Sequence, residues 1–144
     1  MSTVEEAIDW AASFIERFEN AEEPLFTLHG MEEPEDGSFQ MPFYVRSPIV
    51  GEFVGGLDKK GLLVPFDWMA WSDTADSYIG NPESLLDASA DVCFKLLTLH
   101  IRADRFTDGH LAQMLENGHI TTILKRLREI RKSGQPIELP SNDQ

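Results

Sequence analysis

The sequence predicts one mainly α-helical domain packed around a single buried helix. The 144 residues match the usual size of one domain, and 42% hydrophobic with 26% charged residues is typical of a globular chain. Segments with helical hydrophobic spacing, separated by caps, prolines and glycines, predict five or six helices. The segment ADVCFKLLTLHIRADRF, residues 90–106, is apolar around most of its circumference. It is therefore expected to form the central helix, at about 90–105, covered on several sides.

At the N-terminus, a helix is expected from a cap at Thr3 to about Glu19, because Thr3 and Glu6 have the spacing of a capping box. Residues 20–40 are rich in acids and breakers, which predicts an acidic loop. The apolar runs 25–28 and 41–45 flank it and predict a short β-hairpin within 25–46. Residues 1–40 contain eleven acids and one base.

Two helices are predicted between this hairpin and the central helix. Ser47 and Pro48 form a helix start, with an end at Gly61, and the pair Gly55-Gly56 indicates close packing or a shorter helix. Asp67 is expected to cap the next helix, with Phe66 and Trp71 as its hydrophobic staple. A short helical turn over 82–86 and a cap at Ser89 then lead into the central helix.

Two further helices are expected after the central one. Phe106 and Leu111 have the spacing of a staple around a cap at Thr107, which predicts a helix to Asn117. The last helix runs from the break at Gly118 to Gly134. Residues 135–144 are expected to be a frayed tail of the single domain 1–144.

The chain is strongly acidic, with a formal net charge of −13. This charge disfavours binding to bare nucleic acid or an anionic membrane. No stretch has the length of apolar sequence needed to span a bilayer, and no secretory signal is recognised at the N-terminus. The lone Cys93 falls on the apolar side of the central helix and is expected to be a core side chain. These features predict a cytoplasmic protein.

His100 and Asp104 are the candidate catalytic residues, because they are polar side chains one turn apart on the buried side of the central helix. The favoured interpretation is structural: the two bond to each other, or Asp104 accepts hydrogen bonds from the start of the next helix. The alternative is a histidine general base oriented by a carboxylate. No nucleophile or oxyanion donor is recognisable beside them.

His110 and His119 are possible metal ligands together with His100. His110 and His119 fall at helix starts, where solvated or capping histidines are common, and their spacing with His100 matches no established zinc pattern. The sequence therefore predicts no metal and no cofactor.

An aromatic-rich span suggests candidate ligand-binding residues, Tyr44, Trp68 and Trp71. Aromatic side chains more often pack in a core, so burial is the favoured interpretation.

The last helix carries a basic face, with Lys125, Arg128 and Lys132 as candidate interaction residues. Two helices joined by a tight turn also have the outline of a helix-turn-helix nucleic-acid binder. Bases in the last turn equally complement the helix dipole, and the turn glycine is misplaced for that motif. A contact within the chain or with an acidic partner is therefore favoured.

Three segments resemble an uncharacterised bacterial domain family of unknown function. They are VPFDWMAW (64–71), HIRADRFTDGHL (100–111) and GHITTILKRL (118–127), which contain the P-F-D-W and R-A-D-R-F-x-x-G-H-L patterns. The resemblance covers about 41–131 and leaves the acidic N-terminal region outside. It implies a discrete domain and no particular activity.

The sequence contains no recognisable catalytic motif, which leans against an enzyme. The leading hypothesis is a non-enzymatic interaction module that binds a protein partner or associates with itself, since acids gather at the N-terminus and bases near the C-terminus. The alternative is a small ligand-binding protein or enzyme that uses His100 and Asp104 near an aromatic pocket.

Overall fold

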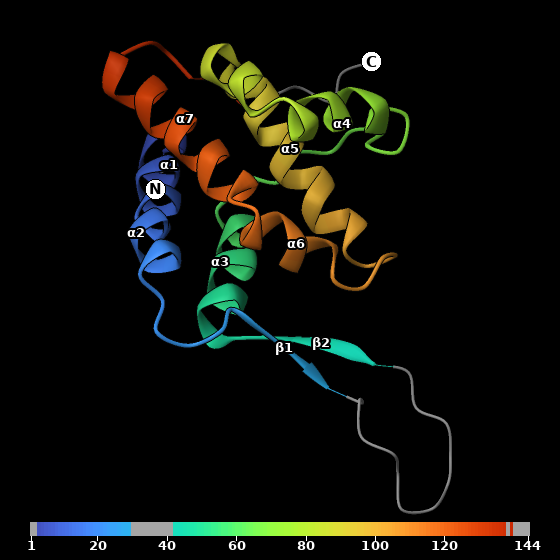
Figure 1. The fold of residues 1–144 in the computed structure, drawn as a ribbon. Helices are drawn as coiled ribbons and strands as arrows, with labels where there is room; N and C mark the ends of the chain where they lie inside the picture. Colours follow the sequence, from blue (N-terminus) through green and yellow to red (C-terminus); the bar gives the residue numbers. More distant parts are fainter. Residues whose placement is uncertain (1–2, 30–41, 138, 140–144) are drawn as a thin grey trace, which may run out of the picture.

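The computed structural model describes residues 3–29, 42–137 and 139, and this part of the chain is mainly α-helical, as predicted. It contains α1 (Val4–Ala12), α2 (Phe14–Glu19), β1 (Phe26–His29), β2 (Phe43–Arg46), α3 (Pro48–Lys59), α4 (Ser72–Gly80), the 3₁₀-helix η1 (Pro82–Asp87), α5 (Ala90–Ala103), α6 (His110–Glu116) and α7 (His119–Ser133). The helices form a body, and the two strands extend away from one end of it (Figure 1).

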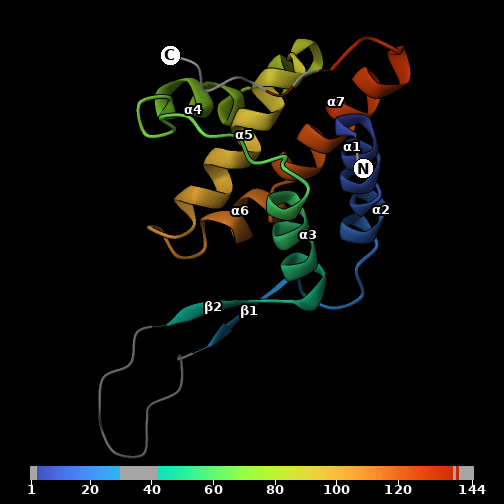
Figure 2. The ribbon, with the colours of Figure 1, turned by 180° about the vertical axis from the view of Figure 1, so that it is seen from behind.

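Helix α5 occupies the centre of the body, as predicted. It packs against α4, α6 and α7, and it lies between α4 and α7 in both views (Figures 1 and 2). Thr98 of α5 is polar but buried, with 1% of its surface exposed. Its hydroxyl donates to the Phe94 carbonyl and accepts from the Val64 N–H, each at 2.8 Å, which satisfies the buried oxygen.

The N-terminal segment forms two helices where the sequence predicted one. The Thr3 hydroxyl accepts from the Glu6 N–H at 3.1 Å, so the predicted cap is confirmed. The helix is interrupted at Ser13, whose hydroxyl bonds to the Trp10 carbonyl and competes with the backbone pattern. The backbone of Ser13 keeps helical angles, and α2 continues along nearly the same line as α1 (Figure 1).

Helix α3 begins at Pro48 and ends before Gly61, as predicted, and Gly61 has φ +77°. The Ser47 hydroxyl makes no capping bond, so that part of the prediction is wrong. Close packing at the glycine pair is confirmed for Gly56, where an added Cβ would overlap the Trp10 ring, while Gly55 has open space around it.

Two predicted helix starts are wrong. Helix α4 begins at Ser72, and Asp67 instead accepts from the Ala70 N–H at 3.3 Å in a turn before the helix. Helix α6 begins at His110 after Gly109, and Phe106 is 72% exposed instead of stapling the helix. The α5–α6 loop reverses direction through Gly109 at φ +88°, which moves the helix start past Thr107.

The predicted hairpin is confirmed. Strands β1 and β2 are antiparallel, with Thr27 opposite Val45 and Leu28 opposite Tyr44. Of the expected acidic loop 20–40, residues 30–40 lie outside the described residues.

The C-terminal helix also matches the prediction, because α7 lies between Gly118 at φ +82° and Gly134 at φ +78°. Beyond it, Ile137 is 5% exposed and packs in the core, while residues 138 and 140–144 of the expected tail lie outside the described residues. No helix in the described part of the chain combines the length and the hydrophobicity needed to cross a lipid bilayer.

Candidate functional site

Three histidines from three different helices meet where α5, α6 and α7 pack together, and two of them are buried. The Nδ1 atom of His100 on α5 lies 2.9 Å from Nε2 of His110 on α6. The rings of His100 and His119 on α7 meet edge to face, with centroids 4.9 Å apart. His100 is 0% exposed and His119 is 6% exposed, so His119 is not the solvated residue that its place at a helix start indicated. We call these three residues the histidine cluster.

The surroundings keep the histidine cluster neutral at pH 7. Burial, and secondarily the positive charges that His119 and His110 would carry, lowers the pKa of His100 to about 2. Burial, and secondarily His110, lowers the pKa of His119 to about 4. Burial also lowers the pKa of His110, although Asp104 and Asp76 act in the opposite direction. Each imidazole therefore carries one N–H and one bare nitrogen.

The histidine cluster is only partly satisfied by hydrogen bonds. The Nε2 atoms of His100 and His119 are buried and have no partner among the described residues. An unsatisfied buried polar group costs about 1 to 3 kcal/mol. Within the described residues, no three His, Cys, Asp or Glu side chains are placed to hold a metal ion together.

Asp104 joins three elements at the end of α5. One carboxylate oxygen accepts from the Leu111 N–H of α6 at 2.9 Å, and the other lies 3.1 Å from the Arg46 guanidinium of β2. Its side chain is 13% exposed. The two candidate catalytic residues thus have separate partners, since His100 is paired with His110. His100 is also fully buried, whereas a general base must reach its substrate.

The candidate aromatic residues lie in different local clusters. Trp68 packs against Phe106 with ring centroids 5.8 Å apart, and Trp71 packs against Phe66 and Tyr78. Tyr44 packs on Phe26, and its ring lies against Gly109. No ring contact in the described part of the chain joins Tyr44 to either tryptophan.

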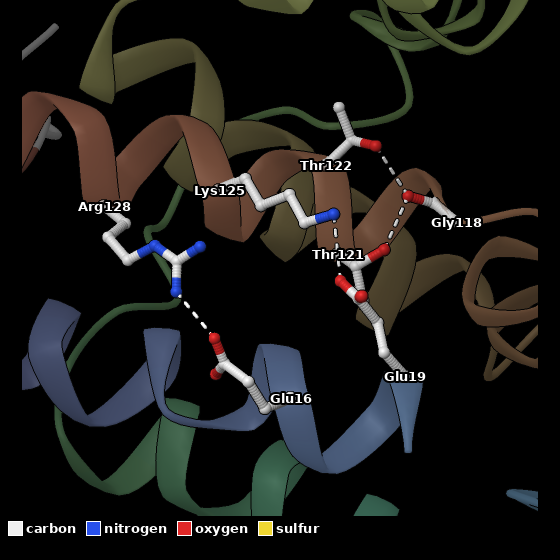
Figure 3. A network of polar contacts seen from close by, with 7 residues as sticks. All are labelled: Glu16, Glu19, Gly118, Thr121, Thr122, Lys125 and Arg128. Atoms are coloured by element: carbon white, nitrogen blue, oxygen red, sulfur yellow. Dashed lines mark hydrogen bonds and ion pairs between the residues drawn. The ribbon is translucent and has the colours of Figure 1, made fainter. Parts of the chain in front are cut away.

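The basic face of α7 lies against the acidic faces of α1 and α2. Lys125 pairs with Glu19 and Arg128 with Glu16, each at 2.9 Å (Figure 3). Nearby, Arg131 lies 3.3 Å from Asp9. These side chains are 36–60% exposed, so water and salt screen the pairs and each contributes little to stability.

The third candidate of this face, Lys132, lines a hollow of about 290 Å³ between α1, α2 and α7. At the start of α7 the Thr121 and Thr122 hydroxyls both donate to the Gly118 carbonyl (Figure 3). Asp9, Glu16 and Glu19 are therefore paired with bases of α7 within one chain.

Cys93 has the properties of a core side chain. It is 0% exposed, and burial raises the pKa of its thiol to about 12, although Arg126 acts in the opposite direction. The reactive thiolate is therefore not formed at neutral pH.

The hairpin carries exposed apolar residues, of which only Tyr44 is among the residues predicted from sequence to bind a ligand. Leu28, Phe43, Tyr44 and Val45 are 41–45% exposed. Phe43 and Val45 point to one face of the ribbon, and Leu28 and Tyr44 to the other. Successive side chains of a strand point to opposite faces, so the unbroken run of large apolar side chains at 43–45 places apolar groups on both faces of the hairpin. This run is the sequence signal that could have identified the surface.

A hollow of about 330 Å³ lies beside Tyr44, between β2 and α6. Asp108, His110 and Glu116 contribute to its lining, together with Thr107, Gly109, Ala112 and Gln113. The Asp108 carboxylate also accepts from the Tyr44 N–H at 3.0 Å, which holds the outer edge of β2 beside the α5–α6 loop.

Comparisons with known proteins place the chain in a family without assigning it a reaction. Searches of curated proteins and of solved structures returned no match. Residues 3–133 match a family of unknown function, DUF6508. The match includes the acidic N-terminal region, whereas the resemblance seen in the sequence covered only about 41–131. The wider match agrees with the structure, in which α1 and α2 pack on α7. The chain therefore belongs to this family of unknown function, DUF6508.

Proposed function

We propose that the chain is a non-enzymatic protein-interaction module and that the β1–β2 hairpin binds the partner. The observation that carries this proposal is the exposure of Leu28, Phe43, Tyr44 and Val45, each above 40%, on two adjacent four-residue strands. Apolar side chains gathered on a projecting element are typical of interaction surfaces.

The hairpin is anchored at its base, which makes it a defined surface. The Ser47 N–H donates to the Leu25 carbonyl at 2.9 Å, and Phe26 packs against the core. Arg46 and the Tyr44 N–H are held by the α5–α6 loop. An isolated two-stranded hairpin is marginally stable in water, so these anchors explain how it can remain formed with exposed apolar residues.

Strand β1 also supports the proposal through its backbone. Its only strand neighbour in the described part of the chain is β2, so its other edge is open. An open edge presents unpaired N–H and C=O groups that a partner strand can bind.

We propose a foreign protein in place of a second copy. The acidic and basic segments that suggested self-association pair with each other inside the chain, through Glu16 and Arg128 and through Glu19 and Lys125. Two copies at −13 each repel one another. A buried free Cys93 is compatible with the reducing cytoplasm, where we place the protein.

Site-specific photo-crosslinking tests the proposal. A benzoylphenylalanine at position 43 or 45, in cells of the source organism, is expected to give a discrete adduct. The same probe at Met69 or Leu86, which are 59% and 62% exposed, provides the control for exposure alone. Equal adducts at all four positions, or none at 43 and 45, would contradict the proposal. A covalent dimer of the chain would contradict the foreign partner.

The protein identified in the adduct is then purified and its affinity measured by calorimetry. Leu28→Ser with Phe43→Ser is expected to weaken binding at least tenfold, because this variant removes one exposed apolar side chain from each face of the hairpin. Leu86→Ser is the matched control and is expected to bind like the parent. Unchanged affinity in the double variant would remove the hairpin from the interface.

A further inference from the structure

The hollow between Tyr44 and α6 differs in charge from two other hollows on the surface. The hollow between α1, α2 and α7 contains Asp9 and Glu16, but also three bases. The hollow of about 400 Å³ near the start of α3 contains Glu22 and Glu23, but also Arg17. The hollow beside Tyr44 contains Asp108 and Glu116 and no lysine or arginine. Of these three hollows, it is the one whose lining contains acidic side chains but no lysine or arginine.

Its acids also lack cationic partners elsewhere in the described residues. Neither Asp108 nor Glu116 takes part in an ion pair there, although Asp108 accepts from the Tyr44 N–H. By contrast, Glu16, Glu19 and Glu52 each pair with a base at 2.8–2.9 Å. A cation that enters this hollow therefore need not displace a base of the chain itself.

The aromatic wall of the hollow adds a second attraction for a cation. Tyr44 is 42% exposed and lies against Gly109, where an added Cβ would come within 2.6 Å of the ring. An ammonium or guanidinium group near an exposed aromatic face gains about 0.5 to 1 kcal/mol. A volume of about 330 Å³ accommodates one long side chain, whose aliphatic stem can lie along the ring and Ala112.

Position connects this hollow to the proposed interface. Tyr44 lines the hollow and lies directly opposite the exposed Leu28, so the two side chains share one face of the hairpin. A protein segment on that face can extend a side chain past Tyr44 toward Glu116. We infer that this hollow receives a lysine or arginine side chain of the partner protein. This inference rests on the proposed function of the hairpin.

Nuclear magnetic resonance with a single-residue probe tests the inference without knowledge of the partner. N-acetyl-arginine amide and N-acetyl-lysine amide are titrated into the ¹⁵N-labelled full chain at millimolar concentrations. We expect saturable shifts of the Gly109, His110 and Gln113 amides. N-acetyl-citrulline amide has nearly the same shape without the charge and is expected to shift them at least threefold less. Equal shifts with citrulline, or no shifts at these amides, would overturn the inference.

Matched charge variants locate the binding. Glu116→Gln removes a carboxylate from the hollow and is expected to weaken the arginine probe at least threefold. Glu22→Gln makes the same change in the hollow that contains Arg17 and is expected to have no effect. Equal weakening by both variants would show attraction to the overall charge alone and would overturn the inference.

The two proposals can fail separately. If Leu28→Ser with Phe43→Ser abolishes partner binding while Glu116→Gln leaves both partner and probe binding intact, the hairpin is the interface and the inferred cationic side chain is wrong. If the probe binds in the hollow but the hairpin variant binds the partner normally, the proposal that the hairpin binds the partner is wrong.

Discussion

The histidine cluster predicts a specific loss of stability in mild acid. An unfolded histidine binds a proton near pH 6.5, whereas the folded chain holds His119 neutral down to a pKa of about 4 and His100 to about 2. Because the folded-state pKa values lie below the unfolded one, protons bind the unfolded chain first. The free energy of unfolding is therefore highest above pH 6.5 and falls as the pH drops through that value.

The size of this loss follows from the proton balance. Between pH 7 and pH 5, each histidine that stays neutral in the folded state removes about 2 kcal/mol of stability. His100 and His119 together remove about 4 kcal/mol, and the lowered pKa of His110 acts in the same direction. The pKa values of Glu16 and Glu52 are lowered by hydrogen bonds from Arg128 and Arg17, so these carboxylates lose their contribution below this range.

The test compares parent and His119→Phe by urea unfolding at pH 7 and pH 5, followed by tryptophan fluorescence. The variant removes one titrating group and keeps a ring beside His100, so its loss between the two pH values should be about 2 kcal/mol smaller than that of the parent. His29→Gln replaces an exposed histidine outside the cluster and should retain the loss of the parent. Equal losses in His119→Phe and the parent would refute the reasoning.

Three other predictions concern the core and the α5–α6 junction. Gly56→Ala should lower the free energy of unfolding by about 1 to 3 kcal/mol, because the added Cβ would overlap the Trp10 ring. Gly55→Ala has open space and should be neutral or stabilise by up to about 1 kcal/mol. Urea unfolding measures both variants, and equal effects would contradict the close packing at Gly56. Cys93 should resist iodoacetamide at pH 8 in the native protein and react once urea unfolds it; equal labelling rates would show that the thiol is accessible. Asp104→Ala should lower the free energy of unfolding by about 1 to 3 kcal/mol, because the Leu111 N–H loses its acceptor. Asp104→Asn should cost less, since the amide oxygen can still accept from that N–H. Melting temperatures equal to that of the parent in both variants would exclude a structural role.

The local features of the fold could be predicted from sequence because each depends on neighbouring residues. The cap at Thr3, the end of α7 at Gly134 and the paired strands follow from capping, glycine conformation and β propensity. The start of α6 could not be predicted in this way. Its first N–H groups are partly satisfied by Asp104 from the preceding helix, so the local staple pattern of Phe106 was misleading.

The histidine cluster could be predicted only in part. Helical spacing places His100 on the buried side of α5, and that placement is correct. The meeting of His100 with His110 and His119 depends on how α5, α6 and α7 cross, which spacing along a single helix does not determine. The exposure of Leu28, Phe43 and Val45 could not be predicted for a related reason, because apolar sequence in a strand ordinarily indicates that another layer covers it.

The charge pattern shows why one sequence feature supported two different functions. Acids near the N-terminus and bases near the C-terminus can pair within one chain or between two chains, and only the position of α7 against α1 and α2 separates these cases. Pairing inside the chain engages Glu16 and Glu19, so these two acids are not free to attract a second copy. Asp108 and Glu116 take part in no such pair among the described residues, and they line a hollow beside the exposed ring of Tyr44 on the projecting hairpin. The unsatisfied charge and the unsatisfied apolar surface thus lie side by side, and a single partner segment with an apolar strand and one basic side chain would complement both.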